Sequence, residues 1–181
     1  MKTLILIPVM YNEEELKKIL PSIPQDFESV SLEYWSYIEE KLTPLKNNIY
    51  IIFVEKSTPI KGEHKVAVLL RNFHEGCKEF RCIDNDMLVA ETESWLELLK
   101  NDPNIAVREL LAENIRERDS YAGHVINQTL VDGKIGILFL NPARQVPFPE
   151  SIRVIRMCRF DPIDYLNRHL AKLNTKKHDS H

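Results

Sequence analysis

Residues 49–55, with the sequence IYIIFVE, decide the fold. Six apolar or aromatic residues in a row, ended by a glutamate, indicate a short strand that is buried on both faces, as the strands of parallel sheets are. Similar runs lie at residues 3–9, 134–140 and 152–157, with a shorter one at 81–83. The sequence therefore predicts about five strands.

Stretches with helical spacing separate these runs. Asn12 with three following glutamates predicts a capped helix start, and Asp102 with Pro103 predicts another. We expect helices at residues 12–20, 31–42, 66–80, 88–100, 102–129 and 161–173. Strands that alternate with helices build an α/β fold, here an open, mostly parallel sheet with helices on both faces. We predict one α/β domain over residues 1–173 and a disordered polar tail over residues 174–181.

Composition limits the classes of partner. The chain has 181 residues, of which 44% are hydrophobic and 28% charged, and its net charge is -3. These values are typical of a globular domain and give no reason to expect nucleic acid or an anionic membrane as a partner. Its apolar runs are too short for a signal sequence or a membrane span, so we expect a cytoplasmic protein.

Several standard sites are excluded by the residues themselves. Glycine occurs at only five positions, which rules out a phosphate-binding P-loop and the glycine-rich dinucleotide fingerprint. No nucleophile elbow of an α/β-hydrolase can be written either. The three cysteines, Cys77, Cys82 and Cys158, are too few and too irregular for a disulfide scaffold or a zinc site, and we expect ordinary thiols.

Polar residues follow each predicted strand at the place where ligands of parallel sheets bind. If the sheet is parallel, these side chains gather at one edge of it. Polar loops occur in every protein, however, so the pattern also fits ordinary surface turns. The residues are Tyr11, Asn12 and Glu13 after the first strand, Glu55 after the second, Asp84 and Asp86 after the third, and Asn141 and Arg144 after the fourth.

The long helix predicted over residues 102–129 carries a sharper signal. Its apolar stripe is interrupted by Arg118 and Asp119, three and four residues after Ile115. Buried charges are unfavourable unless they are paired. We expect this pair either to line a cavity or to form a structural ion pair with a strand-end carboxylate such as Glu55.

One resemblance rests on residues 114–122 (NIRERDSYA), 126–130 (INQTL) and 133–140 (GKIGILFL). This stretch resembles a family of uncharacterised prokaryotic α/β proteins and looks distantly like the TraB/Tiki and erythromycin-esterase group. In that pattern an Arg-Asp helix precedes a Gly-Ile-Leu-Phe strand, and the strand leads into a Gly-x-x-His turn. Here residues 141–144 (NPAR) replace that turn, and Tyr11 stands near the position of a first histidine.

The resemblance implies a hydrolase-like protein, or an inactive relative of one because both turn histidines are replaced. It implies a site with Glu55, Arg118 and Asp119 as catalytic residues. In that site Glu55 or Asp119 acts as a base or ligand, and Arg118 or Arg144 holds an anionic group of a small-molecule substrate. The expected substrate-binding residues are Asn12, Glu13, Asn141 and Arg144. The cofactor, if any, is not fixed by the pattern.

A second resemblance is to GT-A type glycosyltransferases. It rests on residues 7–14 (IPVMYNEE), which look like the opening strand and nucleotide loop, and on 83–86 (IDND) followed by 95–99 (WLELL). It implies that Asp84 and Asp86 hold a divalent metal that neutralises a nucleotide-diphosphate leaving group.

A third interpretation is a non-catalytic module that binds a partner or forms a homo-oligomer. The aromatic residues Tyr34, Trp35 and Tyr37 supply an apolar face for such a contact. A helix packed into the core explains the same residues.

Overall fold

The computed structural model describes residues 1–58, 64–74 and 79–178. It contains one five-stranded sheet, in which every strand pair is parallel and the strand order is β3-β2-β4-β1-β5. The predicted α/β fold is therefore confirmed. The strands are β1 (Lys2–Pro8), β2 (Ile49–Val54), β3 (Glu79–Cys82), β4 (Ile135–Leu140) and β5 (Ile152–Arg156).

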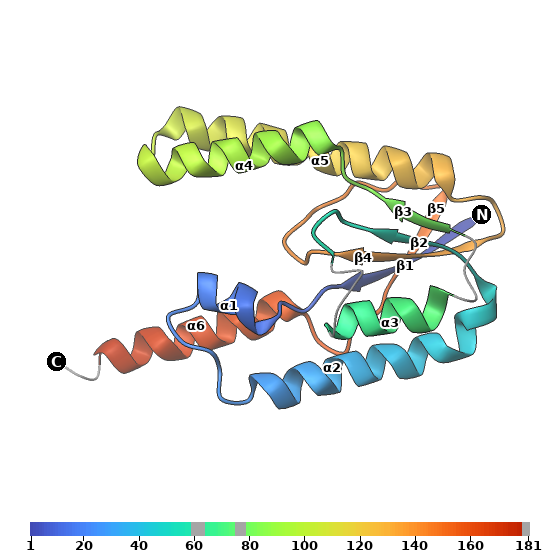
Figure 1. The fold of residues 1–181 in the computed structure, drawn as a ribbon, viewed down its shortest axis with the longest axis horizontal. Helices are drawn as coiled ribbons and strands as arrows, with labels where there is room; N and C mark the ends of the chain where they lie inside the picture. The colour runs from blue at the N-terminus through green and yellow to red at the C-terminus, as the bar shows by residue number, and fades with distance from the viewer. Residues whose placement is uncertain (59–63, 75–78, 179–181) are drawn as a thin grey trace.

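Helices cover both faces of this sheet (Figure 1). One face carries α2 and α3, and the other carries α5, on which α4 packs. None of the helices within the described residues is long and apolar enough to span a membrane. The helical elements are α1 (Glu13–Ile19), α2 (Phe27–Leu42), the 3₁₀ helix η1 (Thr43–Asn48), α3 (Lys65–His74), α4 (Asp86–Asn101), α5 (Ile105–Thr129) and α6 (Pro162–His178).

The apolar runs form two cores, one on each face of the sheet. In β1, Ile5 and Ile7 belong to the core beneath α2 and α3, whereas Leu4 and Leu6 belong to the core beneath α5. Successive side chains of a strand point to opposite faces, so a strand covered on both sides must be apolar at every position. This requirement explains why residues 49–55 and their counterparts lack polar alternation.

Some element boundaries differ from those predicted. The long helix begins at Ile105 with Asn104 as its cap, because the Asn104 side chain accepts a hydrogen bond from the Ala106 amide, so Asp102 is not the cap. The helix predicted over residues 66–80 ends earlier, since Glu79 and Phe80 pair with β2. The last helix continues past residue 173 to His178, into the segment predicted to be a disordered tail.

The aromatic residues of α2 are explained by the core. Tyr34 is fully buried, and its hydroxyl donates a 2.5 Å hydrogen bond to the main-chain oxygen of Pro8. Trp35 is 6% exposed and meets the Tyr34 ring edge-on, at 5.2 Å between centroids. Tyr37 is half-buried beside Lys41. Burial leaves Tyr34 and Trp35 too little surface to form the contact face of an oligomer.

The topology separates the loops at the carboxyl edge of the sheet. The chain leaving β1 passes into α1 on the α2 face, where Leu16 and Leu20 join the core. The chain leaving β4 instead runs to the α5 face, where Val146 and Phe148 pack. β1 and β4 are adjacent and their loops run to opposite faces, which is the arrangement that forms the ligand-binding crevice of open α/β sheets.

Candidate functional site

Five of the charged residues singled out in the sequence meet at the carboxyl edge of the sheet. Glu55, Asp84, Arg118, Asp119 and Arg144 form one connected set of ion pairs, called here the ion network. Their side chains are between 1% and 18% exposed. The residues come from the ends of β2 and β3, from the middle of α5 and from the segment after β4, so the parallel topology is what brings them together.

Arg144 is the centre of the ion network. Its Nη1 group lies 2.9 Å from Glu55 Oε1 and 2.9 Å from Asp84 Oδ1. Its Nε group donates to Asp119 Oδ1 at 2.7 Å, and its Nη2 group donates to the main-chain oxygen of Arg118 at 3.3 Å. Arginine suits this position because its planar guanidinium carries five donors in a fixed geometry.

Arg118 connects the ion network to α4. Its Nη2 group lies 3.1 Å from Asp84 Oδ1, and its Nη1 group donates to the Thr92 hydroxyl at 3.3 Å. The Thr92 hydroxyl in turn donates to Asn114 Oδ1 at 2.5 Å, within the α4–α5 contact. Of the two outcomes expected for the Arg118–Asp119 pair, the ion pair is observed, although its partners are Asp84 and Arg144.

Every carboxylate oxygen of the ion network has a donor. Glu55 receives the Arg144 guanidinium on one oxygen and the Asn141 amide on the other. Asp84 accepts from both arginines on Oδ1 and from the Lys56 amide, at 2.9 Å, on Oδ2. The second oxygen of Asp119 accepts from the Gln145 amide at 2.9 Å. The network therefore fixes the ends of β2 and β3 and the segment after β4 to α5.

Burial and pairing move the pKa values of these carboxyl groups in opposite directions. Burial raises the pKa of Glu55 above its ordinary 4.5, against the opposing effect of Arg144. Burial also acts to raise the pKa of Asp84, but the Lys56 amide and the two guanidinium groups outweigh it and hold this pKa below 3.8. The neighbouring carboxylates raise the pKa of Arg144, so its charge is permanent.

Asn12 and Glu13 lie apart from the ion network. Asn12 caps α1 in a reciprocal capping box with Glu15, with hydrogen bonds of 2.8 and 2.9 Å. Glu13 forms an exposed 2.8 Å ion pair with Lys17. The sequence prediction thus combined two separate groups of residues, because every strand end was counted toward one site.

A small cavity opens beside these α1 residues. Its volume is about 200 Å³, and we call it the crevice cavity. Backbone and side chains of the β1–α1 segment form one wall, α2 forms another with Phe27, Ser31 and Trp35, and the start of α3 supplies His64 and Lys65. It lies on the α2 side of the crevice between β1 and β4.

Tyr11 connects the crevice cavity to the ion network. This residue lines the cavity, and its hydroxyl donates to Asn141 Oδ1 at 3.3 Å. The Asn141 amide in turn donates to Glu55. Burial, followed by the charges of Glu15 and Glu55, raises the pKa of Tyr11, which keeps the hydroxyl protonated and able to donate. Asn141 is thus placed between the two groups, as a strand-end residue of β4.

The two aspartates of the glycosyltransferase interpretation have protein partners. Both oxygens of Asp84 are hydrogen-bonded within the ion network, and Asp86 Oδ1 lies 2.7 Å from Lys56 Nζ. In the part of the chain that the structure describes, no three residues among His, Cys, Asp and Glu are grouped closely enough to bind a metal ion. Of the cysteines, Cys82 is exposed and Cys158 half-buried, and Cys77 lies outside the described residues.

Some members of this region were not found from the sequence. Thr92 and Gln145 bond to the ion network and Asn114 bonds to Thr92, yet each is an ordinary polar residue in its local pattern. Asn114 is 3% exposed and lies four residues before Arg118 on the helix. A buried asparagine on the same stripe as a charged pair is the signal that could have indicated the α4 contact.

The sequence matches no family model, no curated protein and no solved structure. The two family resemblances therefore stay predictions.

Proposed function

We propose that this protein is a non-catalytic binding domain that holds a small organic ligand in the crevice cavity. One observation carries the proposal. Each oxygen of the three buried carboxylates at the carboxyl edge already accepts a hydrogen bond from an arginine or a main-chain amide. A carboxylate that serves as the base of a hydrolase must reach substrate or water, and a carboxylate held by a guanidinium on one oxygen and an amide on the other does not do so.

The composition of the cavity supports a binding role. Trp35, Phe27 and Tyr11 supply aromatic surface, and the polar side chains of the lining are those of Asn12, Glu13, Glu15, Ser31, His64 and Lys65. Small-molecule sites likewise combine apolar and aromatic surface with placed polar groups. The ion network would hold the segment after β4 in a fixed position, because Glu55 accepts from the Asn141 amide. Asn141 would in turn fix the Tyr11 hydroxyl that bonds to it.

The resemblance to the erythromycin-esterase group fits the same proposal. The chain carries Arg144 where that pattern has a turn histidine. Arg144 is the residue that neutralises Glu55 and Asp119. Histidine gains and loses a proton near neutral pH, whereas arginine stays charged. We infer that arginine at this position has a structural role in place of the catalytic role that a histidine could have.

The test uses the two tryptophans of the chain. The substitution Trp95→Phe leaves Trp35, which lines the crevice cavity, as the single tryptophan. A library of neutral and charged fragments is titrated while Trp35 emission is recorded. The matched variant Ser31→Met fills the cavity from α2 without touching the ion network. We expect fragments that shift the Trp35 emission in the Trp95→Phe protein to have no effect once Ser31→Met is added.

The same proteins are assayed with the chromogenic substrates p-nitrophenyl acetate, p-nitrophenyl phosphate and p-nitrophenyl glycosides. We expect no turnover above the uncatalysed rate. Turnover that Glu55→Gln abolishes in a folded protein would establish the hydrolase instead. A complete absence of fragment binding to the wild-type cavity would contradict the binding role.

A further inference from the structure

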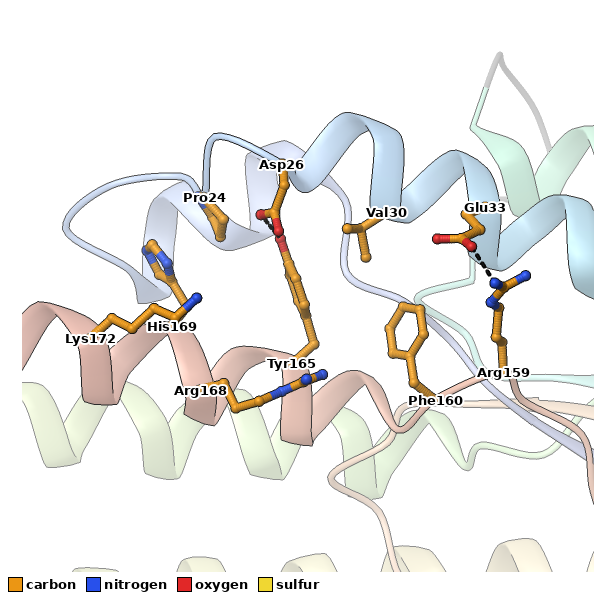
Figure 2. A pocket seen from close by; sticks show the side chains of 10 residues that line it. All are labelled: Pro24, Asp26, Val30, Glu33, Arg159, Phe160, Tyr165, Arg168, His169 and Lys172. Atoms are coloured by element: carbon orange, nitrogen blue, oxygen red, sulfur yellow. Dashed lines mark hydrogen bonds and ion pairs between the residues drawn. The ribbon is translucent and has the colours of Figure 1, made fainter.

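A second, larger cavity lies on the other side of α2. Its volume is about 400 Å³, and it is lined by α2, by α6 and by the segment that joins α1 to α2 (Figure 2). We call it the α2–α6 cavity. Phe27, Ser31 and Trp35 of α2 face the crevice cavity, whereas Asp26, Val30 and Glu33 face this one. The helix therefore stands between two separate sites.

One face of α6 supplies most of the polar wall. Tyr165, Arg168, His169 and Lys172 follow one another at steps of three, one and three residues, which places them along a single helical face. The opposite wall combines the apolar Pro24 and Val30 with Asp26 and Glu33, and Phe160 lies between Val30 and Arg159 (Figure 2). The Phe160 and Tyr165 rings lie 6.1 Å apart between centroids, at an interplanar angle of 44°.

The two carboxylates of the cavity wall are already engaged. Asp26 Oδ1 accepts a 2.9 Å hydrogen bond from the Tyr165 hydroxyl, and Glu33 forms an ion pair with Arg159 (Figure 2). Burial and the Asp26 carboxylate raise the pKa of Tyr165, so this hydroxyl stays a donor to Asp26. Neither acid therefore forms an ion pair with Arg168.

Arg168 keeps most of its donors for a ligand. Its Nε group donates to the main-chain oxygen of Asp164 at 3.2 Å, which orients the side chain. Within the described residues, its two Nη groups have no protein acceptor. His169 donates through Nε2 to the main-chain oxygen of Ser22 at 3.2 Å, which holds the ring against the α1–α2 segment. Lys172 adds a further cation one turn later on α6.

We propose that the α2–α6 cavity binds a small organic oxyanion with a planar apolar body, an aromatic carboxylate or an aromatic phosphate monoester. A guanidinium presents two parallel N–H donors that match both kinds of oxyanion, and its charge strengthens these hydrogen bonds. The wall holds three cationic side chains and two carboxylates, on a chain whose net charge is -3. The Phe160 and Tyr165 rings with Val30 supply the surface for the planar body.

The experiment compares matched probes by isothermal titration calorimetry on the full chain. Benzoate and phenyl phosphate carry the oxyanion on a ring, benzamide is the neutral counterpart, and inorganic phosphate lacks the apolar body. We expect benzoate or phenyl phosphate to bind at least about tenfold more tightly than benzamide or inorganic phosphate. Which of the two binds more tightly identifies the oxyanion as a carboxylate or a phosphate.

Two variants test the assigned position. Arg168 is exposed and outside the cores, so Arg168→Gln should fold, and we expect it to weaken the aromatic oxyanion by about tenfold or more. Arg116→Gln, an exposed arginine of α5, is the control and should bind like the wild type. A second cavity variant, Val30→Glu, places a carboxylate beside the oxyanion site and should abolish binding.

Three results would overturn the proposal. They are equal affinity of the wild type and Arg168→Gln for the tighter aromatic oxyanion, binding of benzoate and phenyl phosphate that is in both cases no tighter than that of benzamide, and binding of both that is no tighter than that of inorganic phosphate. Ser31→Met separates this site from the crevice cavity. Binding that survives Ser31→Met supports the α2–α6 cavity whether or not the crevice cavity binds its own ligand, and binding lost in Ser31→Met would place the probe in the crevice cavity instead.

Discussion

Replacing Arg144 by methionine should destabilise this protein more than replacing any exposed arginine. Methionine keeps much of the length of the side chain but removes its charge and all of its donors. Glu55 Oε1 and Asp119 Oδ1 then lose their partner, at side chains that are 5% and 7% exposed. Asp84 retains Arg118 at 3.1 Å. Two carboxylates are thus left buried and uncompensated.

The size of the loss follows from that geometry. Breaking a buried ion pair by removing one partner costs about 3–5 kcal/mol, because the other charge stays desolvated. Domains of this size are stable by about 5–15 kcal/mol, so Arg144→Met should stay folded but close to the limit. With a urea slope of about 2 kcal/mol per M, the unfolding midpoint should fall by about 2 M.

The assay is urea unfolding at neutral pH, followed by far-UV circular dichroism. Arg116→Met is the matched control, since Arg116 is exposed on α5, and its free energy of unfolding should change by less than about 0.5 kcal/mol. The double variant of Arg144→Met with Asp119→Asn should lose less than the sum of the two single losses, because both changes remove the same ion pair. A loss below about 1 kcal/mol for Arg144→Met would refute the reasoning and class these contacts with solvated surface pairs.

Further outcomes follow from the pKa shifts and from one close approach. The raised pKa of Glu55 makes the folded state hold this proton more tightly, so the stability advantage of the wild type over Glu55→Gln should shrink as pH rises above 4.5. The lowered pKa of Asp84 acts in the other direction, so the stability advantage of the wild type over Asp84→Asn should shrink as pH falls below 3.8. Unfolding curves recorded across pH measure both trends. Parallel pH dependence of stability for the wild type, Glu55→Gln and Asp84→Asn would count against the two pKa shifts. Gly123→Ala should destabilise the protein by about 1–3 kcal/mol although alanine favours helices, because a Cβ at Gly123 would lie 2.3 Å from the Pro147 main-chain oxygen. A higher melting temperature for this variant would show that the segment between β4 and β5 can move away.

Much of the fold could be read from the sequence, because a strand covered on both faces must be apolar throughout. Residues 49–54 form the predicted strand with unchanged bounds, and Asn12 is the predicted cap of α1. Boundaries failed where two local signals competed. Both Asp102 and Asn104 are good caps, and the one that accepts the Ala106 amide is Asn104. The local pattern cannot decide between them, because Asp102 is already the C-cap of α4 and only the structure shows where that helix ends.

The site was predicted in part. The interruption of the α5 stripe predicted that Arg118 and Asp119 either line a cavity or form an ion pair, and the strand-end rule placed Glu55, Asp84 and Arg144 at the same edge. The pairing itself could not be derived, because Arg144 lies 89 residues from Glu55 and 25 from Asp119. Strand order brings these ends together, and the sequence predicted a parallel sheet without fixing that order.

The measurement that tests the ion network most directly is the Arg144 Nε–H resonance in a ¹H–¹⁵N spectrum, assigned by its absence in Arg144→Met. This group donates to Asp119 at 2.7 Å in a side chain that is 10% exposed. We expect a resonance that exchanges slowly with water at neutral pH and that shifts and exchanges faster in Asp119→Asn. An Arg144 Nε–H that exchanges as fast as that of Arg116 would contradict the ion network. It would also contradict the argument that the buried carboxylates at the carboxyl edge take no part in catalysis.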